Sequence, residues 1–380
     1  MKVCDVVLNS IWFDPRVRKQ VAQYQALGVE VSCVGFRCAR FDEARVAALP
    51  APAQIVSIDE KYKGKQSSVF RKLSRERQKN RAVYRAILAQ KPDVIHANDF
   101  NALVPAWKAA KKRKCVLVYD AHEINSENYT HGINPLYHHY IRIHERHICR
   151  RVQQMVCVSH AAADYYAKNY KIQKPMVVTN CALASEQVFD KEKSAGFEIL
   201  NHGQYYEGRG YELMIQAAPL LAEHSDIRLA LRGFGRLEDA LRKQAAGLSN
   251  VVFYPPVQVQ ELIASAASAM VGVAITQPIS LNFELSVSNK LFEYAAAGLP
   301  MILSDIPEHR YLNDRYEFGI ILRENTPACF AQAASRLYTD KAFYHRCAGN
   351  ARRLSEEIHW EREFEKLVRT ERSLCAERSR

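Results

Sequence analysis

Short apolar segments alternate with helical patterns along the whole chain. Strands are predicted at residues 2–8, 29–34, 93–97, 115–120, 155–158 and 176–179 in the first half, and at 197–201, 227–231, 251–253, 270–275, 301–303 and 318–322 in the second. The segments between them are mostly amphipathic helical patterns. Such alternation favours parallel sheets covered by helices, and 380 residues are too many for one ordinary core. The sequence therefore predicts an α/β chain of two domains, joined by a polar linker near 191–196.

The composition narrows the cellular setting. The ten cysteines are scattered, with no C-x-x-C pair, which favours reduced, packed thiols over disulfides or a zinc site. No run approaches the roughly 18 apolar residues of a membrane-spanning helix, and the chain opens with a strand pattern, so we expect a cytoplasmic protein. The net charge of +12 points to an anionic partner: nucleic acid, a membrane face or a phosphorylated substrate.

Two segments concentrate the positive charge. Residues 61–91 contain KYKGK and RKLSRERQKNRAVYR, and residues 138–152 are also basic. Apolar residues at helical spacing make the first segment a predicted cationic amphipathic helix. This pattern suits a membrane surface with anionic lipids, and the alternative is an ordinary solvated helix face. Nucleic acid is not expected, because the basic residues are not interleaved with an aromatic platform.

Residues 279–305 form the most informative stretch. An irregular segment leads into a helix that starts near Ser288 and stops at Gly298, and a strand follows. A helix that begins at the rim of a parallel sheet can offer free N–H groups and Lys290 to a phosphate. Glu293 lies one turn deeper, where a carboxylate can accept hydrogen bonds from a ribose diol. The stretch predicts a nucleotide site, and the alternative is a surface Lys290–Glu293 ion pair.

The rims of both predicted sheets carry further polar residues. Gly203, Gly208 and Gly210 surround Arg209 in a strand-to-helix loop, where the backbone can approach a ligand and arginine can clamp a diphosphate. In the first half, His122 directly follows a strand, with Glu123 and Glu127 behind it. These could be acid–base groups, but H-E-x-x-x-E lacks a second histidine, so no metal site is expected. A structural histidine is the alternative.

The first loop of the chain lacks the G-x-G-x-x-G fingerprint, so a dinucleotide fold is not supported. It carries Asp14, Arg16 and Arg18 instead, which are either ligand contacts or an exposed first helical turn.

The order and spacing of these blocks resemble the retaining family-4 glycosyltransferases over nearly the whole length. The resemblance rests on DPRVRKQVAQYQALGVEV, KPDVIHANDFNAL, LVYDAHEINSE, VCVSHAAADYYAKNY, GQYYEGRGYELMIQAA, RGFG and NKLFEYAAAGLP followed by SD. It implies a GT-B fold: two Rossmann-like domains facing across a cleft, with a C-terminal helix crossing back to the first. The expected domains are 1–185 for the acceptor, with helix 359–380 packing back, and 186–358 for the nucleotide sugar.

The resemblance also assigns roles. Arg209 stands where the family binds the donor diphosphate, Glu293 where it binds the ribose, and His122 near the reacting carbon, and these three are the expected catalytic residues. The expected donor-binding residues are Gly203, Gln204, Gly208, Arg209, Gly233, Glu284, Ser288, Asn289, Lys290 and Glu293. The expected cleft residues of the first domain are Asp14, Arg16, Arg18 and Glu123. The chain departs from the family at Leu285, where a glutamate is usual and Glu284 is displaced by one, and at Gln204, where a basic residue is usual.

The implied activity is a retaining transfer of sugar from a nucleotide-diphosphate sugar, UDP favoured over GDP, to a saccharide or membrane-associated acceptor in bacterial surface polysaccharide or glycoconjugate synthesis. No cofactor or metal is expected, because side chains and a helix dipole can stabilise the leaving diphosphate. The expected partners are the nucleotide sugar, a glycan or lipid-linked acceptor and an anionic membrane at its inner face, without nucleic acid. The alternatives are a sugar-nucleotide epimerase or hydrolase, and a non-catalytic basic membrane-binding protein.

Overall fold

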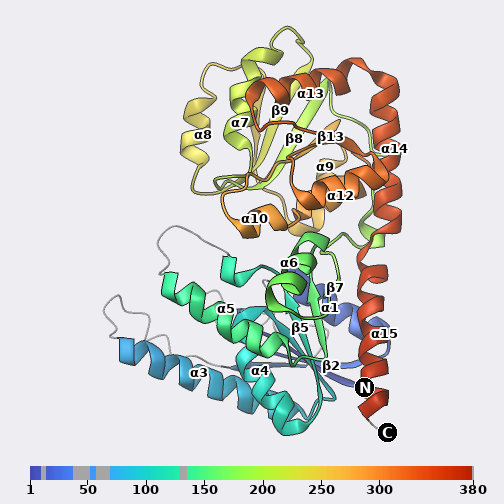
Figure 1. Ribbon diagram of the computed structural model, residues 1–380. Coiled ribbons are helices and arrows are strands. Elements are labelled where there is room, and N and C mark those ends of the chain that lie inside the picture. The colour runs from blue at the N-terminus through green and yellow to red at the C-terminus, as the bar shows by residue number, and fades with distance from the viewer. Residues whose placement is uncertain (10–13, 37–51, 57–68, 128–134, 379–380) are drawn as a thin grey trace. The chain divides into compact units, whose positions relative to one another are not determined.

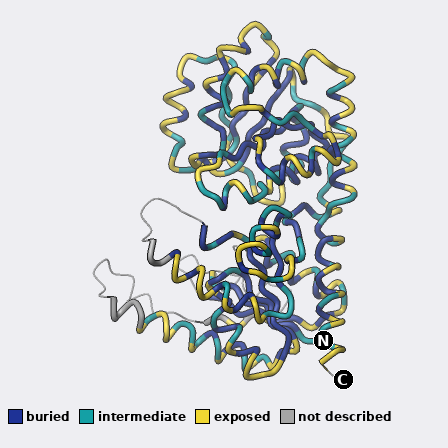
Figure 2. Tube along the Cα trace, viewed as in Figure 1, coloured by how far each residue is buried: buried dark blue, intermediate teal, exposed yellow. Residues whose placement is uncertain are grey.

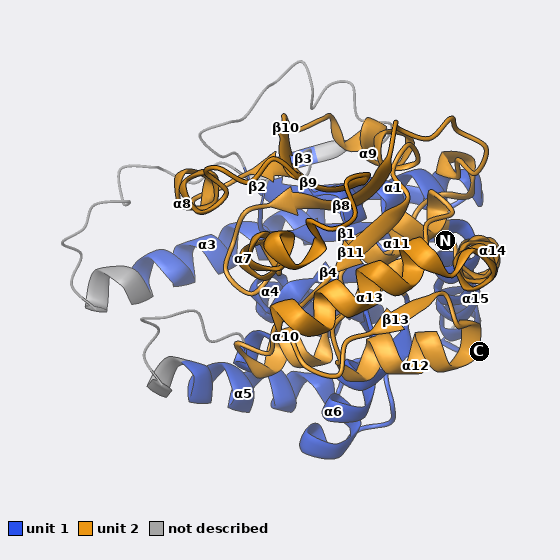
Figure 3. Cartoon of the chain, turned by 90° about the horizontal axis from the view of Figure 1, so that it is seen from above, with its two compact units in different colours: residues 1–178, 361–380 blue, residues 179–360 orange. Residues whose placement is uncertain are grey.

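The chain divides into two compact units, coloured separately in Figure 3. The computed structural model describes residues 1–9, 14–36, 52–56, 69–127 and 135–378. Unit 1 comprises residues 1–178 together with 361–380, and unit 2 comprises residues 179–360. The division thus falls at Val178 and Thr179, where the sequence suggested 185 and 186. Residues 61–68 of the predicted basic segment lie outside the described residues.

Unit 1 is built on a seven-stranded parallel sheet of order β3-β2-β1-β4-β5-β6-β7. Valine and isoleucine fill β1, β2, β4 and β5, which are buried because helices cover both faces. The strands are β1 (Lys2–Val7), β2 (Glu30–Phe36), β3 (Ala53–Val56), β4 (Val94–Asn98), β5 (Val116–Ala121), β6 (Gln154–Cys157) and β7 (Met176–Val177).

The helices of unit 1 lie on the two faces of this sheet (Figure 1). One face carries α1 (Pro15–Ala26) and α15 (Trp360–Arg378), and the other carries α3 (Val69–Gln90), α4 (Asp99–Arg113) and α5 (Pro135–Cys149). Two further elements are α6 (His160–Tyr170) and the 3₁₀ turn η3 (Asn125–Glu127). Asp14 fixes the start of α1, because its side chain accepts hydrogen bonds from the backbone N–H groups of Arg16 and Val17.

Unit 2 contains a six-stranded parallel sheet of order β10-β9-β8-β11-β12-β13. The order reverses beside β8, so the rim where β8 and β11 end is a topological switch point. The strands are β8 (Phe197–Gln204), β9 (Ile227–Phe234), β10 (Val251–Tyr254), β11 (Val271–Ala274), β12 (Met301–Leu303) and β13 (Gly319–Ile321).

Helices of unit 2 follow the predicted alternation, with one difference. The segment before Ser288 was expected to be irregular, but it contains α10 (Leu281–Leu285), because the Ser280 hydroxyl caps the N–H of Phe283. Helix α7 (Tyr211–Ala217) continues as the 3₁₀ turn η5 (Ala218–Leu221), because Pro219 has no N–H to donate. The other helices are α8 (Glu238–Gln244), α9 (Leu262–Ala266), α11 (Asn289–Ala296), α12 (Pro307–Tyr316), α13 (Pro327–Thr339) and α14 (Lys341–Glu357); short 3₁₀ turns are η4 (Ala184–Glu186) and η6 (Val259–Glu261).

Each unit has its own apolar interior, which appears as the dark blue strands of Figure 2. In unit 2 the core packs side chains of α7 and α13 against β8, β9 and β11. The cysteines in the described part of the chain are all free thiols, most of them buried. None of the described helices is long and apolar enough to cross a bilayer.

Candidate active site

The strand ends of β8 and β9 place two glycines against each other at the rim of the unit 2 sheet. Gly203 pairs with Gly233 in the parallel register. A Cβ on Gly233 would lie 1.8 Å from the carbonyl oxygen of Gly203, so no larger residue fits there. A Cβ on Gly203 would lie 3.1 Å from Cε of Lys290, which shows how closely this lysine passes the strand. Both glycines therefore let the loops and the lysine meet at one point.

Lys290 is a buried cation at this rim. Its Nζ donates hydrogen bonds to Oδ1 of Asn201 at 2.8 Å and to the hydroxyl of Tyr211 at 3.1 Å. The pKa of Lys290 is lowered to about 7: burial is the main cause, the positive charge of Arg209 acts in the same direction, and Glu293 opposes the shift. Because burial and the nearby positive charge disfavour the protonated form of Lys290, an anion that binds beside it would stabilise that form.

Glu293 lies one turn after Asn289 in α11, as the spacing predicted. Its Oε2 lies 2.7 Å from Nε2 of His202, a buried residue of β8. The side chain of Glu293 keeps 24% of its surface exposed. The carboxylate is therefore bound by the buried His202 and remains accessible to a ligand from the solvent. The alternative of a surface ion pair between Lys290 and Glu293 does not describe Lys290, which is buried and donates to Asn201 and Tyr211.

Arg209 joins the glycine loop to α10. Its guanidinium lies 4.6 Å from the centre of the Phe283 ring. The carbonyl of Gly208 accepts a hydrogen bond from the N–H of Gln277 at 2.9 Å, and the carbonyl of Arg209 accepts one from Asn201 at 3.2 Å. The two segments singled out in the sequence, 203–210 and 276–290, are therefore in contact. We call Asn201, His202, Arg209, Tyr211, Lys290 and Glu293 the unit 2 cluster.

The remaining predicted residues of this half lie around the cluster. Ser288 is the N-cap of α11, and Asn289 accepts a hydrogen bond from the Asn180 side chain at 3.2 Å. The N–H of Leu291 donates to the carbonyl of Ser288 at 3.1 Å, whereas the N–H groups of Asn289 and Lys290 precede the hydrogen bonds of the helix and suit an anion. Gln204 and Glu284 are exposed, and Leu285 ends α10.

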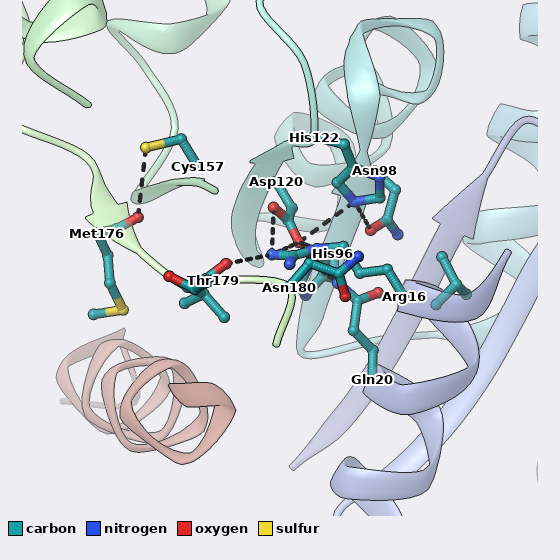
Figure 4. Close-up of polar contacts among 12 residues, drawn as sticks. Arg16, Gln20, His96, Asn98, Asp120, His122, Cys157, Met176, Thr179 and Asn180 are labelled. Carbon is teal, nitrogen blue, oxygen red and sulfur yellow. Dashed lines mark hydrogen bonds and ion pairs between the residues drawn. The ribbon is translucent and has the colours of Figure 1, made fainter. Parts of the chain in front are cut away.

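A buried polar network lies at the corresponding rim of unit 1 (Figure 4). Arg16 binds Asp120 through two hydrogen bonds, from Nε at 2.9 Å and from Nη2 at 3.0 Å. Gln20 donates to the same carboxylate at 2.8 Å. Arg16, an expected cleft residue, is 3% exposed, and its guanidinium holds the Asp120 carboxylate inside unit 1. Arg16 thus positions Asp120, and its contact with a ligand stays a prediction.

His122 lies at the edge of this network. Its Nε2 lies 3.0 Å from Oδ1 of Asn98 and 3.6 Å from Asp120, and its Nδ1 lies 3.6 Å from Asp99. Burial would lower the pKa of His122, but the carboxylates of Asp99 and Asp120 outweigh it and raise the pKa. Both ring nitrogens face acceptors, so His122 is set up as a hydrogen-bond donor.

The other predicted residues of unit 1 are placed as follows. Asp14 is the N-cap of α1, and Arg18 is partly exposed in the first turn of that helix. Glu123 is exposed, and its carbonyl accepts a hydrogen bond from Asn125. Glu127 is bound to Arg142 at 2.9 Å and to the hydroxyl of Tyr165 at 2.6 Å, which gives it a structural role. Within the described ranges, no group of three or more His, Cys, Asp and Glu side chains is placed to hold a metal ion.

Sequence patterns missed several residues of these clusters. His202 and Asn201 belong to the end of β8, where the predicted strand stopped at 201 and the histidine was assigned to the loop. Asp120 and Asn98 are the last polar residues of apolar strands, and Asp120 was counted only as a strand end. A polar residue that closes an otherwise apolar strand was the signal available in each case.

Comparison with protein families finds two matches. Residues 16–184 match Glycosyltransferase Family 4, and residues 196–340 match Glycosyl transferases group 1. A comparison with curated protein sequences finds no match.

Solved structures of similar fold cover nearly the whole chain. Sucrose-phosphate synthase from Thermosynechococcus elongatus has a TM-score of 0.78 at 14% identity, over 99% of both chains. A glycosyltransferase from Rickettsia africae has a TM-score of 0.74 at 13% identity, over 98% of both chains. Anabaena HepE in complex with UDP has a TM-score of 0.73 at 14% identity, over 98% of this chain and 100% of HepE. The two units thus have the GT-B fold.

Proposed function

Because this chain belongs to the GT-B glycosyltransferases, with a family-4 segment followed by a group 1 segment, we propose that it transfers a sugar from a UDP-sugar to a saccharide or lipid-linked acceptor and retains the anomeric configuration. The observation that carries this proposal is the unit 2 cluster. Lys290 and Arg209 bring two positive charges to the rim, and Glu293 places a carboxylate one helical turn deeper. A diphosphate above a ribose matches that arrangement of charges.

The structure of HepE supports uracil as the base of the donor. HepE has the same fold, and its structure is a complex with UDP. We therefore favour a UDP-sugar over a GDP-sugar for this chain.

The proposed chemistry needs positive charge more than a dedicated base. Breaking the bond between sugar and phosphate develops negative charge on the leaving diphosphate, which Arg209, Lys290 and the first N–H groups of α11 would stabilise. The leaving phosphate oxygen would accept the proton of the acceptor hydroxyl on the same face of the sugar, which gives retention. The Nε2 of His122 is bound to Asn98, and its Nδ1 lies 3.6 Å from Asp99, beyond hydrogen-bond distance, so Nδ1–H would be the group that donates a hydrogen bond near the reacting sugar. These groups make a resident metal unnecessary in this proposal.

The proposal also covers the acceptor and the place of the protein in the cell. We infer a membrane-associated acceptor in the synthesis of a bacterial surface glycan, with the protein bound peripherally at the inner face of the membrane. The net charge of +12 and the basic helices α3 and α5 support this inference.

The experiment measures thermal shift and calorimetric binding of UDP, GDP, ADP, TDP and CMP in the presence of EDTA. Selective stabilisation by UDP is expected. UDP-sugars that bind are then incubated with saccharide and lipid-linked acceptors, and the anomeric configuration of the product is determined by NMR. Sugar release or epimerisation without an acceptor would identify a hydrolase or an epimerase instead. Binding of none of the nucleotides would refute the donor site.

A further inference from the structure

His202 contacts Glu293 across the unit 2 cluster but belongs to neither of the loops that carry the sequence motifs. It lies near the end of β8, is buried, and places Nε2 2.7 Å from Oε2 of Glu293 in α11. The contact joins two elements that are 91 residues apart in the sequence. It therefore fixes the position of Glu293 relative to the strand.

The His202 ring is held by Tyr294 as well as by Glu293. The two rings stack with centroids 4.5 Å apart and an interplanar angle of 28°. The backbone N–H of His202 also donates a hydrogen bond to the Tyr294 hydroxyl at 2.9 Å. Because these contacts hold the ring and its strand in place, they fix the direction in which Nε2 points. The carboxylate of Glu293 lies in that direction.

The contact also defines which ring nitrogen carries the proton. An ionised carboxylate only accepts hydrogen bonds, so Nε2 is the donor. Nδ1 is buried and has no hydrogen-bond partner among the described residues. We therefore assign a proton to Nε2, which donates it to Glu293 and orients the carboxylate.

We propose that His202 is a positioning residue for the donor nucleotide. It holds one oxygen of Glu293 so that the exposed edge of the carboxylate accepts both hydrogen bonds of a ribose 2′,3′-diol. This inference rests on the proposed function, because it requires a nucleotide in the unit 2 cluster.

The test compares the affinities of UDP and 2′-deoxy-UDP by calorimetry on the full chain. The wild type is expected to bind UDP at least about tenfold more tightly, since a hydrogen bond to a charged group is lost with the hydroxyl. His202→Phe keeps an aromatic ring on Tyr294 and removes the donor, and its preference for ribose should fall below about threefold. His202→Gln restores an amide donor at the reach of Nε2 and should keep the wild-type preference.

His224→Phe is the matched control. His224 also lies against a tyrosine, Tyr338, with ring centroids 5.0 Å apart, and its Nε2 lies 3.6 Å from the carboxylate of Glu223. It belongs to unit 2 but not to the cluster, so the variant should keep the preference of the wild type for UDP.

Several outcomes would overturn the inference. A folded His202→Phe that discriminates like the wild type would leave His202 with a packing role only. A wild type that binds UDP and 2′-deoxy-UDP equally would show that no diol contact exists to be positioned. If His202→Phe fails to fold, the comparison is made between His202→Gln and His202→Asn, because the asparagine amide lies near the position of Nδ1 and not of Nε2. An equal preference for UDP over 2′-deoxy-UDP in these two variants refutes the inference. A wild type that binds no nucleoside diphosphate refutes the proposed function itself.

Discussion

Lys290 combines a positive charge with a buried position, which is unusual for a lysine. Two neutral groups, the Asn201 amide and the Tyr211 hydroxyl, hold its Nζ, and neither supplies a full negative charge. With a pKa of about 7, Lys290 is only partly protonated near neutral pH. A bound diphosphate would restore the charge by raising this pKa, so binding of the donor and protonation of Lys290 are coupled.

This coupling predicts the pH dependence of donor affinity. UDP-glucose is a suitable probe, because its diphosphate does not titrate near neutral pH. Since the bound state requires the protonated lysine, the affinity should fall as the pH rises through 7, by about tenfold between pH 6.5 and 8. Calorimetry over this range measures the effect.

Two variants serve this measurement. Lys290→Met should bind UDP-glucose weakly and without this pH dependence. Lys243→Met, which removes an exposed lysine from the same unit, should behave like the wild type. A wild-type affinity that stays constant from pH 6.5 to 8 contradicts the assignment of Lys290 to the diphosphate.

Arg209 leads to a second prediction at this scale. Gln204 replaces the other basic position expected in the loop, so Arg209 carries more of the charge stabilisation. Arg209→Ala should lower kcat/KM by a factor on the order of 10²–10³, the loss of one transition-state contact. Arg236→Ala is the control, because Arg236 is exposed on the neighbouring loop and paired with Glu207. A loss below about threefold would exclude Arg209 as the main contact of the diphosphate.

At the scale of elements, α15 is attached to unit 1 through a buried polar contact. The Tyr24 hydroxyl of α1 donates to Glu371 of α15 at 2.7 Å and lies 2.8 Å from Nδ1 of His96 in β4. Phe364 of α15 packs edge-on against the Tyr24 ring, with centroids 4.8 Å apart. Burial alone would lower the pKa of His96, but hydrogen bonds to Asp120 and Glu371 raise it to about 10, so the buried carboxylates face a cation.

This contact predicts a specific loss of stability. Tyr24→Phe keeps the ring and removes the hydroxyl, which leaves the buried Glu371 with one donor fewer. The free energy of unfolding should fall by about 1–3 kcal/mol, the usual result of leaving a buried polar group without its partner. Urea denaturation followed by circular dichroism measures it. Tyr311→Phe, an exposed tyrosine in α12, should change stability little, and an equal loss in both variants would contradict the role of the buried contact.

Local patterns predicted most elements and part of the site. The start of helix α13 is marked by such a pattern, because Thr326 caps its first turn and Pro327 occupies its first position. The relation between Lys290 and Glu293 also follows from helical spacing alone. The bonds of Arg16 to Asp120 and of His202 to Glu293 join residues 104 and 91 positions apart, and no local pattern contains such pairs.

At the scale of the whole molecule, the excess positive charge is arranged in part along one helix. Arg77, Arg81 and Arg85 are exposed at intervals of four along α3, and Val83 and Ile87 are buried on its other side. Residues four apart share a helix face, so the three arginines form a continuous stripe. Such a stripe suits a surface of anionic lipid.

The stripe predicts salt-sensitive membrane binding. In sedimentation with vesicles, the protein should bind phosphatidylglycerol more than phosphatidylcholine, and high salt should release it because it screens the attraction. Replacing Arg77, Arg81 and Arg85 by glutamate should weaken binding at least about tenfold, since each basic residue contributes roughly 1 kcal/mol. The same replacement at Arg228, Arg323 and Arg346, which are exposed in unit 2, is the control for net charge. Equal binding to neutral vesicles would reject the role of the stripe.

The discontinuous unit 1 sets an order of events during synthesis. Residues 179–360 are contiguous, so unit 2 has its whole sheet before the ribosome reaches Glu361. Tyr24 and His96 are made early, but Glu371 and Phe364, which contact them, are made after all of unit 2. While unit 2 is being translated, the surface of unit 1 around Tyr24 and His96 therefore remains exposed, because α15 has not yet been made. Unit 1, whose translation begins first, is therefore the last to be completed.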